Sequence, residues 1–113
     1  MKVFIVHAHH EPKSFNGALT EAAIAALTAN GHETCVSDLC AMGFDPVSDR
    51  RNYTTTGDGD YLKQQGEEAN ATAHGGFAPD IEAELEKLDW CDVLIFQFPI
   101  WLACHSERMR KYY

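Results

Sequence analysis

The chain has 113 residues, 45% of them hydrophobic, and a formal net charge of −8 from nine basic and seventeen acidic side chains. A chain of this length forms one domain, and its apolar content is that of a globular rather than a disordered protein. The negative charge argues against a nucleic-acid or anionic-membrane surface, and no apolar run approaches the roughly 20 residues that span a bilayer. We therefore expect a cytoplasmic protein without membrane insertion, whose partners are small molecules or other proteins.

The four cysteines, Cys35, Cys40, Cys91 and Cys104, show neither CxxC spacing nor the density of a disulfide framework. Reduced thiols are the expected state in a compartment that keeps them so. Because none of these cysteines has the spacing of a zinc ligand pair, no metal site is predicted.

The first forty residues predict a strand, a helix and a second strand. The apolar run at residues 2–7 predicts a central strand, which Pro12 prevents from continuing. Residues 14–16 offer N-cap chemistry to a helix with apolar residues at helical spacing, and Asn30-Gly31 ends that helix. A shorter strand follows at residues 33–39. Strand, helix and strand in this order imply parallel strands with a right-handed crossover.

The rest of the chain predicts two helices and a third strand. A polar helix at residues 61–73 ends at Gly75-Gly76, and Pro79 and Asp80 start another helix through residue 89. Residues 91–98 form an apolar strand whose β-branched and aromatic content favours cover on both faces. The element order predicts an α/β fold with a doubly wound parallel sheet, reduced to about three strands where such sheets usually have five or more.

Two segments are candidates for binding a cofactor at the carboxyl edge of this sheet. His7, His9 and His10 lie at the carboxyl end of the first strand beside a helix N-terminus, which suits a phosphate group. The alternative is a solvated histidine loop beside an ordinary N-cap. The aromatic loop after the third strand could form a wall for a flat ring, with simple core filling as the alternative. The usual dinucleotide and nucleoside-triphosphate fingerprints are absent.

The remaining polar clusters predict no catalytic group. No GxSxG motif for nucleophilic catalysis is present. The acids of the last helix are expected on its exposed face, unpaired for acid–base work; they are Glu82, Glu84 and Glu86. A further cluster, Asp45, Asp49, Arg50 and Arg51, is interpreted as solvated charge.

Four segments resemble one enzyme family in order along the chain. Residues 9–18, His-His-Glu-Pro-Lys-Ser-Phe-Asn-Gly-Ala, resemble the flavin-phosphate segment of the NAD(P)H:quinone oxidoreductase (DT-diaphorase-like) family. Residues 37–46, residues 79–81, Pro-Asp-Ile, and residues 92–101, Asp-Val-Leu-Ile-Phe-Gln-Phe-Pro-Ile-Trp, look like the same family. The resemblance implies a flavodoxin-like fold and covers residues 1–101, the N-terminal part of the family's flavin-binding domain.

The resemblance also implies a cofactor, a reaction and a partner. FAD, or FMN in some relatives, binds at the carboxyl edge of the sheet across a homodimer interface. NAD(P)H delivers a hydride to the flavin and leaves, and a quinone then takes both electrons in a ping-pong reaction. By resemblance, His9, Phe15, Asn16 and Ala18 would contact the pyrophosphate and ribityl end. Pro99, Ile100 and Trp101 would line the isoalloxazine ring.

Residues 102–113 depart from the family pattern. Codons exist for residues 100–109 that, read one base later, encode Phe-Gly-Leu-Pro-Ala-Ile-Leu-Lys-Gly, the family's continuation. We therefore interpret the tail as a frameshift product, which the coding DNA would test. The family's hydride-transfer residues have no matching position here, so no catalytic residue is assigned. A copy that is incomplete in this way is expected to expose the third strand as an apolar sheet edge and to depend on self-association. It would be an incomplete quinone reductase, a non-catalytic flavin-binding or dimerising fragment, or an inert truncation product.

Overall fold

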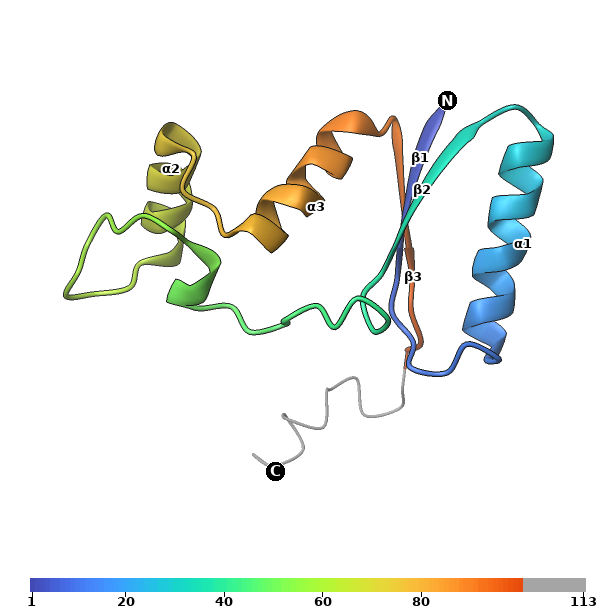
Figure 1. The fold of residues 1–113 in the computed structure, drawn as a ribbon, viewed down its shortest axis with the longest axis horizontal. Helices are drawn as coiled ribbons and strands as arrows, with labels where there is room; N and C mark the ends of the chain where they lie inside the picture. Colours follow the sequence, from blue (N-terminus) through green and yellow to red (C-terminus); the bar gives the residue numbers. More distant parts are fainter. Residues whose placement is uncertain (101–113) are drawn as a thin grey trace.

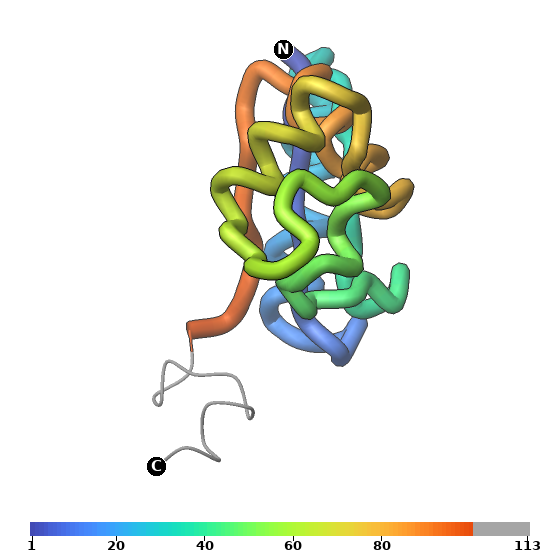
Figure 2. Tube along the Cα trace, turned by 90° about the vertical axis from the view of Figure 1, so that its left-hand side faces the viewer, coloured from blue at the N-terminus to red at the C-terminus, as the bar shows by residue number. Residues whose placement is uncertain are grey.

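The computed structural model describes residues 1–100, and these residues form an α/β arrangement (Figure 1). The structure confirms the predicted strand–helix–strand start and the later helices and strand, with ends shifted by up to three residues. The elements are β1 (Lys2–His7), α1 (Phe15–Ala29), β2 (Glu33–Asp38), the short 3₁₀ helix η1 (Arg50–Asn52), α2 (Gln64–His74), α3 (Pro79–Trp90) and β3 (Val93–Gln97). Across its principal axes the molecule measures 50 × 39 × 18 Å, and its thinness is visible in Figure 2.

The described residues place three parallel strands in one sheet, in the order β2-β1-β3. The central strand β1 carries the core, because Val3, Phe4 and Ile5 are at most 1% exposed. Helices α1 and α3 lie on opposite faces of the sheet (Figure 1), as a doubly wound topology requires. The predicted α/β class with about three parallel strands is therefore confirmed.

Helix α1 begins and ends where its sequence provides caps. The Ser14 hydroxyl oxygen accepts a hydrogen bond from the Gly17 backbone N–H at 3.1 Å, which satisfies one of the unpaired donors of the first turn. At the other end, Gly31 has a φ of +79°, a conformation that glycine adopts without the penalty a side chain would bring. These two caps delimit α1 as a helix of 15 residues, which connects β1 to β2.

Helix α3 is held to the sheet by a polar network as well as by apolar contact. Ser37, fully buried on β2, donates its hydroxyl to Glu84 at 2.7 Å, and Lys87 donates to both Ser37 at 2.8 Å and Glu84 at 2.7 Å. The expectation that Glu84 lies on the exposed face of this helix was therefore wrong. A lysine one turn later and a serine on the neighbouring strand satisfy the carboxylate, and pairing is what allows a charged group to sit against a sheet.

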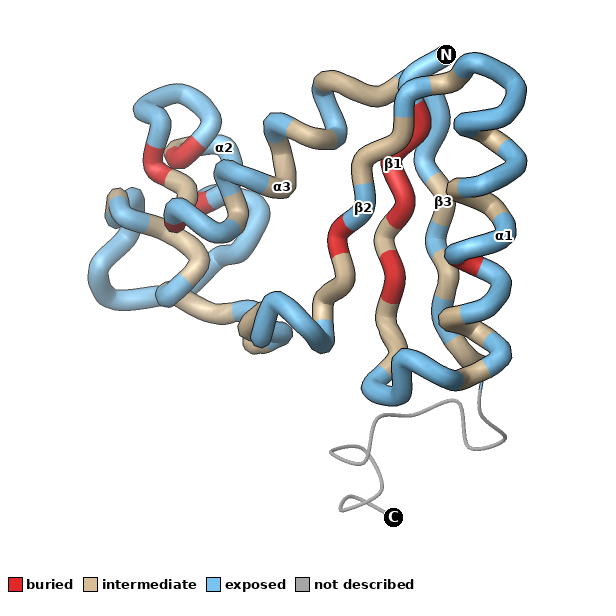
Figure 3. Tube along the Cα trace, turned by 45° about the vertical axis from the view of Figure 1, so that its right-hand side comes forward, coloured by how far each residue is buried: buried red, intermediate tan, exposed pale blue. Residues whose placement is uncertain are grey.

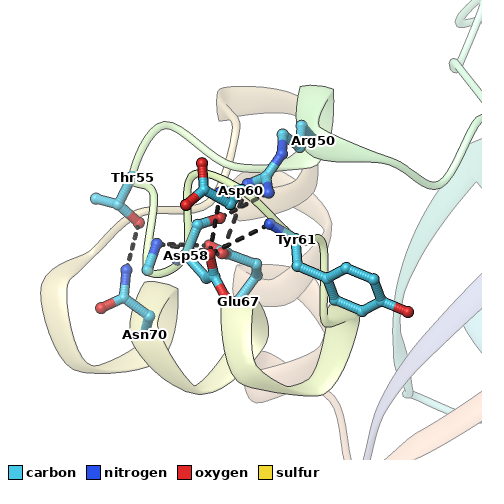
Figure 4. Close-up of polar contacts among 8 residues, drawn as sticks. Arg50, Thr55, Asp58, Asp60, Tyr61, Glu67 and Asn70 are labelled. Atoms are coloured by element: carbon cyan, nitrogen blue, oxygen red, sulfur yellow. Dashed lines mark hydrogen bonds and ion pairs between the residues drawn. The ribbon is translucent and has the colours of Figure 1, made fainter.

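Residues 39–78 form a lobe that extends away from the sheet on the α3 side (Figure 1). Figure 3 shows buried residues along β1 and, separately, within the lobe. The lobe is centred on Glu67 of α2, which is 2% exposed although it belongs to a helix with few apolar residues. Its carboxylate accepts hydrogen bonds from the Gly57 N–H and the Asp58 N–H, both at 2.9 Å, and the Arg50 guanidinium lies 3.6 Å away (Figure 4). A buried carboxylate therefore anchors the loop before α2.

Strand β3 lies at the edge of the sheet that residues 1–100 form, paired with β1. Its apolar side chains remain accessible: Leu94 is 37% exposed, Phe96 63% and, just beyond the strand, Phe98 52%. Within the described residues, this confirms the expected apolar sheet edge. The predicted tail, residues 102–113, lies outside the part of the chain that the structure describes.

Candidate functional site

The parallel strands bring their carboxyl ends together at one edge of the sheet. The Ala8 N–H, just after β1, donates to the Gln97 carbonyl oxygen at the end of β3 at 3.0 Å. On the other side, the Leu39 N–H, just after β2, donates to the His7 carbonyl oxygen at 2.9 Å. The loops that follow the strands therefore start side by side, in the position where open α/β sheets bind ligands.

The first turn of α1 is fixed to this edge by a side-chain hydrogen bond. The Gln97 side-chain amide donates from Nε2 to Asn16 Oδ1 at 2.9 Å, and this joins the start of α1 to the end of β3 across 81 residues of sequence. The Ser14 hydroxyl accepts the Gly17 N–H, and the start of a helix favours anions.

The loop that leads into α1 packs tightly on the helix. A Cβ atom at Gly17 would lie 2.4 Å from the Pro12 carbonyl oxygen, closer than any real contact. The loop also closes on itself, because the Ser14 N–H donates to the Glu11 carbonyl oxygen at 3.2 Å and the Glu11 N–H to His9 Nδ1 at 3.0 Å. The close approach of loop and helix depends on glycine at position 17.

Six of the seven predicted cofactor residues lie in the described part of the chain, on the two segments that meet at this edge. His9 is half-buried, and its ring stacks on that of His10 with the ring centres 4.6 Å apart. Phe15 on the first turn of α1 is 77% exposed, and Ile100 after β3 is 82% exposed. The remaining described members of the set are Asn16, Ala18 and Pro99. Trp101 lies outside the described residues.

Two polar groups at this edge have contacts that the sequence did not predict. Gln97 was interpreted only as part of an apolar strand, yet its side chain joins β3 to α1. His7 was grouped with the loop histidines as a candidate phosphate ligand, but it is 5% exposed and its Nδ1 lies 2.8 Å from the Thr20 hydroxyl of α1. The signal for both was a polar residue at the last position of an apolar strand, where the sheet ends and helix side chains approach.

A separate cavity of about 510 Å³ lies between the lobe and α3, away from the carboxyl edge. Its apolar walls include Phe44, Phe77 and Ile81, and Tyr53 and Glu68 contribute polar groups. Burial, and then the nearby carboxylate of Glu68, raise the pKa of the Tyr53 phenol. None of the predicted cofactor residues lines this cavity.

Within residues 1–100, no three histidine, cysteine, aspartate or glutamate side chains converge in a way that could hold a metal ion. Over the same residues, every helix is too short or too polar to cross a bilayer.

The chain is similar to known quinone-reducing proteins over most of its length. It is 42% identical over 100 residues to NAD(P)H dehydrogenase [quinone] 1 of Cavia porcellus, which covers 88% of this chain and 36% of that protein. It is 40% identical over 101 residues to the human ribosyldihydronicotinamide dehydrogenase [quinone], covering 88% of this chain and 44% of that protein. The chain thus spans well under half of the length of the curated relatives it matches.

Solved structures of similar proteins have the same fold as this chain. A crystal structure from Klebsiella pneumoniae, described as that of a candidate quinone reductase, superposes with a TM-score of 0.86 at 40% identity and covers 99% of this chain and 43% of that one. The model of the flavodoxin-like fold family matches residues 1–112. The resemblance in the sequence is therefore confirmed, and the chain belongs to the family of proteins with a flavodoxin-like fold.

Proposed function

We propose that the chain binds a flavin at the carboxyl edge of its sheet and derives from an enzyme that reduces quinones with NAD(P)H. The observation that carries the proposal is the junction of α1 with β3 through Asn16 and Gln97, which joins the phosphate-type site to the loop after β3. The proposed flavin contacts are His9, Phe15, Asn16, Ala18, Pro99, Ile100 and Trp101. FAD is the proposed cofactor, with FMN as the alternative.

The residues of this edge fit such a group. The first turn of α1 offers backbone N–H groups and a partial positive charge, and both attract a pyrophosphate. This local attraction matters because the net charge of the whole protein is −8. The accessible side chains of Phe15 and Ile100 offer apolar surface to a flat ring. A helix end that binds phosphate and apolar side chains that meet a ring are the two halves of a flavin site.

The reaction class comes from the relatives, which are NAD(P)H- and ribosyldihydronicotinamide-dependent quinone dehydrogenases. A bound flavin would accept a hydride from NAD(P)H and deliver it to a quinone. In this scheme the described residues bind and orient: the start of α1 holds the phosphates, and the end of β3 sets the plane of the ring. We assign no catalytic residue. A homodimer is part of the same proposal.

A second candidate function is a non-catalytic module that binds flavin or pairs with another chain. The observation that favours it is the exposure of the β3 side chains Leu94 and Phe96 within residues 1–100. Turnover of menadione with NADH or NADPH separates the enzyme from this module.

Titration of the purified protein with FAD, followed by quenching of flavin fluorescence, tests the site. Saturable binding is expected, and Asn16→Ala should weaken it about fivefold, since a hydrogen bond that fixes the first turn contributes about 1 kcal/mol. Asn70→Ala, a change in the lobe, is the matched control and should leave binding unchanged. Far-UV circular dichroism establishes that each variant is folded. A folded protein that does not bind FAD, or equal loss in both variants, would contradict the proposal.

A further inference from the structure

The aromatic wall of the cavity between the lobe and α3 is held in place by backbone pairing. Tyr53 and Phe77, which both line the cavity, form an isolated antiparallel bridge, and the centroids of their rings lie 6.1 Å apart. Backbone hydrogen bonds of 2.7 and 2.8 Å join the same two segments, residues 52–54 and 76–78. The two rings therefore have fixed positions, as in a ligand site that exists before its ligand arrives.

The other walls of the cavity are attached to the rest of the fold by side-chain hydrogen bonds. Residues 44–48 are joined to α2, because the Gln64 side-chain amide donates to the Ser48 hydroxyl at 2.7 Å. Helix α3, which contributes Ile81 and Leu85, is fixed to the sheet by its own polar network. At about 510 Å³ the cavity has the size of a small-molecule site.

The charges around this cavity have one sign. Two carboxylates line it, those of Asp45 and Glu68, and none of the described lining residues is a lysine, arginine or histidine. Asp45 is paired at 3.0 Å with Arg51, which does not line the cavity. Within residues 1–100, no basic side chain lies within ion-pair distance of Glu68. The charge of Glu68 reaches the cavity wall, since it adds to burial in raising the pKa of the Tyr53 phenol.

We propose that this cavity binds a small organic cation, a flat apolar molecule that carries a protonated amine. Phe44, Tyr53 and Phe77 offer three aromatic rings, and aromatic faces attract both flat rings and ammonium groups. The Glu68 carboxylate supplies the opposite charge. Because Glu68 is exposed, the amine can keep part of its hydration while the ring enters the cavity, which avoids the cost of burying an ion pair.

The same charge separates this cavity from the proposed cofactor site. The phosphates of a flavin or of NAD(P)H would meet the Glu68 carboxylate, and like charges repel. The inference therefore does not depend on the proposed function, and loss of flavin binding would leave it intact.

NMR titration of the full chain tests the preference for a cation. The probes are naphthylmethylamine, which is protonated at neutral pH, and naphthylmethanol, which has the same ring without the charge. With both probes we expect saturable shifts of the backbone amide signals of Phe44, Phe77 and Ile81. The amine should bind about fivefold more tightly, because it adds an ion pair and a cation–π contact at an accessible site. Equal affinity for the two probes, or no saturable shift at these residues, would overturn the proposal.

Glu68→Gln separates the effect of the charge from that of the apolar walls. It should weaken binding of the amine about two- to fivefold and leave binding of the alcohol unchanged. Glu21→Gln is the matched control, because it removes an exposed carboxylate from α1, on the opposite face of the sheet from the lobe (Figure 1). It should change neither affinity. Equal weakening of the amine in both variants would assign the preference to the net charge of the protein and would refute the proposal.

Thr72→Trp tests whether the probes enter this cavity. Thr72 lines the cavity from an exposed position of α2, so a tryptophan there would occupy part of its volume. Both probes should bind about tenfold more weakly, because apolar contact is lost, whereas Thr28→Trp at an exposed position of α1 should have no effect. Unchanged binding to Thr72→Trp would place the probes elsewhere. Shifts of the same signals with protein concentration alone would mean that a second copy fills the cavity, which would also overturn the proposal.

Discussion

The tight packing of the loop before α1 makes Gly17→Ala a discriminating test of the candidate site. The added Cβ would lie 2.4 Å from the Pro12 carbonyl oxygen, about 1 Å short of an ordinary contact. Because the obstacle is backbone, the loop itself must move, which strains the hydrogen bonds that Glu11 and Ser14 make within it. Overpacking of this kind costs about 1 to 3 kcal/mol, and the better helix propensity of alanine returns at most about 1 kcal/mol. The difference is an expected net loss centred on about 1 kcal/mol of unfolding free energy.

Gly66→Ala provides the matched control for this prediction. Gly66 is also the third residue of a helix, but its Cβ would lie 3.7 Å from the Lys63 Cβ, an ordinary contact. This variant should be more stable by about 0.5 to 1 kcal/mol. Urea unfolding followed by far-UV circular dichroism measures both, at one protein concentration because association links stability to concentration. If Gly17→Ala stabilised the protein as Gly66→Ala does, the contact with Pro12 would not constrain the loop.

Three further predictions concern the caps and the polar networks. Ser14→Ala removes the N-cap of α1 and should cost about 1 kcal/mol in the same urea experiment, with no change if the cap carries no stability. The N–H groups of Asp58 and Gly57 lower the pKa of Glu67 in the folded protein below its unfolded pKa of about 4.5. The ionised carboxylate therefore stabilises the fold above the unfolded pKa, and this stabilisation is lost as pH falls through the lower folded pKa. The protection factors of the amides in loop 54–61, which are corrected for the intrinsic pH dependence of exchange, should therefore fall in acid. Glu67→Gln should abolish that pH dependence, and an unchanged profile in the variant would contradict it. Lys87→Met leaves the Glu84 carboxylate paired only with the Ser37 hydroxyl and should cost about 1 to 3 kcal/mol, whereas a neutral result would show that the network adds nothing.

The sequence predicted the sheet and the helices that cover it because each has a local signal. Strand β1 is an uninterrupted apolar run, α1 lies between a serine cap and a glycine stop, and α3 begins at Pro79. These signals depend on residues adjacent in the chain. The end of β3 was placed one residue too late, at Phe98 rather than Gln97, because Pro99 cannot donate a hydrogen bond to β1 and the ladder stops before it.

The features that the sequence did not reveal depend on residues far apart in the chain. Glu67 was one acid among many in a helix without a clear apolar face, and its burial follows from a loop nine to ten residues earlier that directs N–H groups at it. The pairing of Glu84 was missed for the same reason, because its partner Ser37 lies 47 residues away in sequence. A carboxylate's own neighbours in sequence do not distinguish a solvated acid from an anchored one. The expected cluster of solvated charge is confirmed for Arg51, Asp45 and Asp49, whose side chains are at least 42% exposed. Its fourth member, Arg50, instead lies 3.6 Å from the buried carboxylate of Glu67.

Strand β3 connects the sheet to the candidate site, and its sequence suits cover on both faces. The strand meets β1 along one side and the start of α1 at its carboxyl end. Within residues 1–100, Leu94 and Phe96 keep much of their side chains accessible.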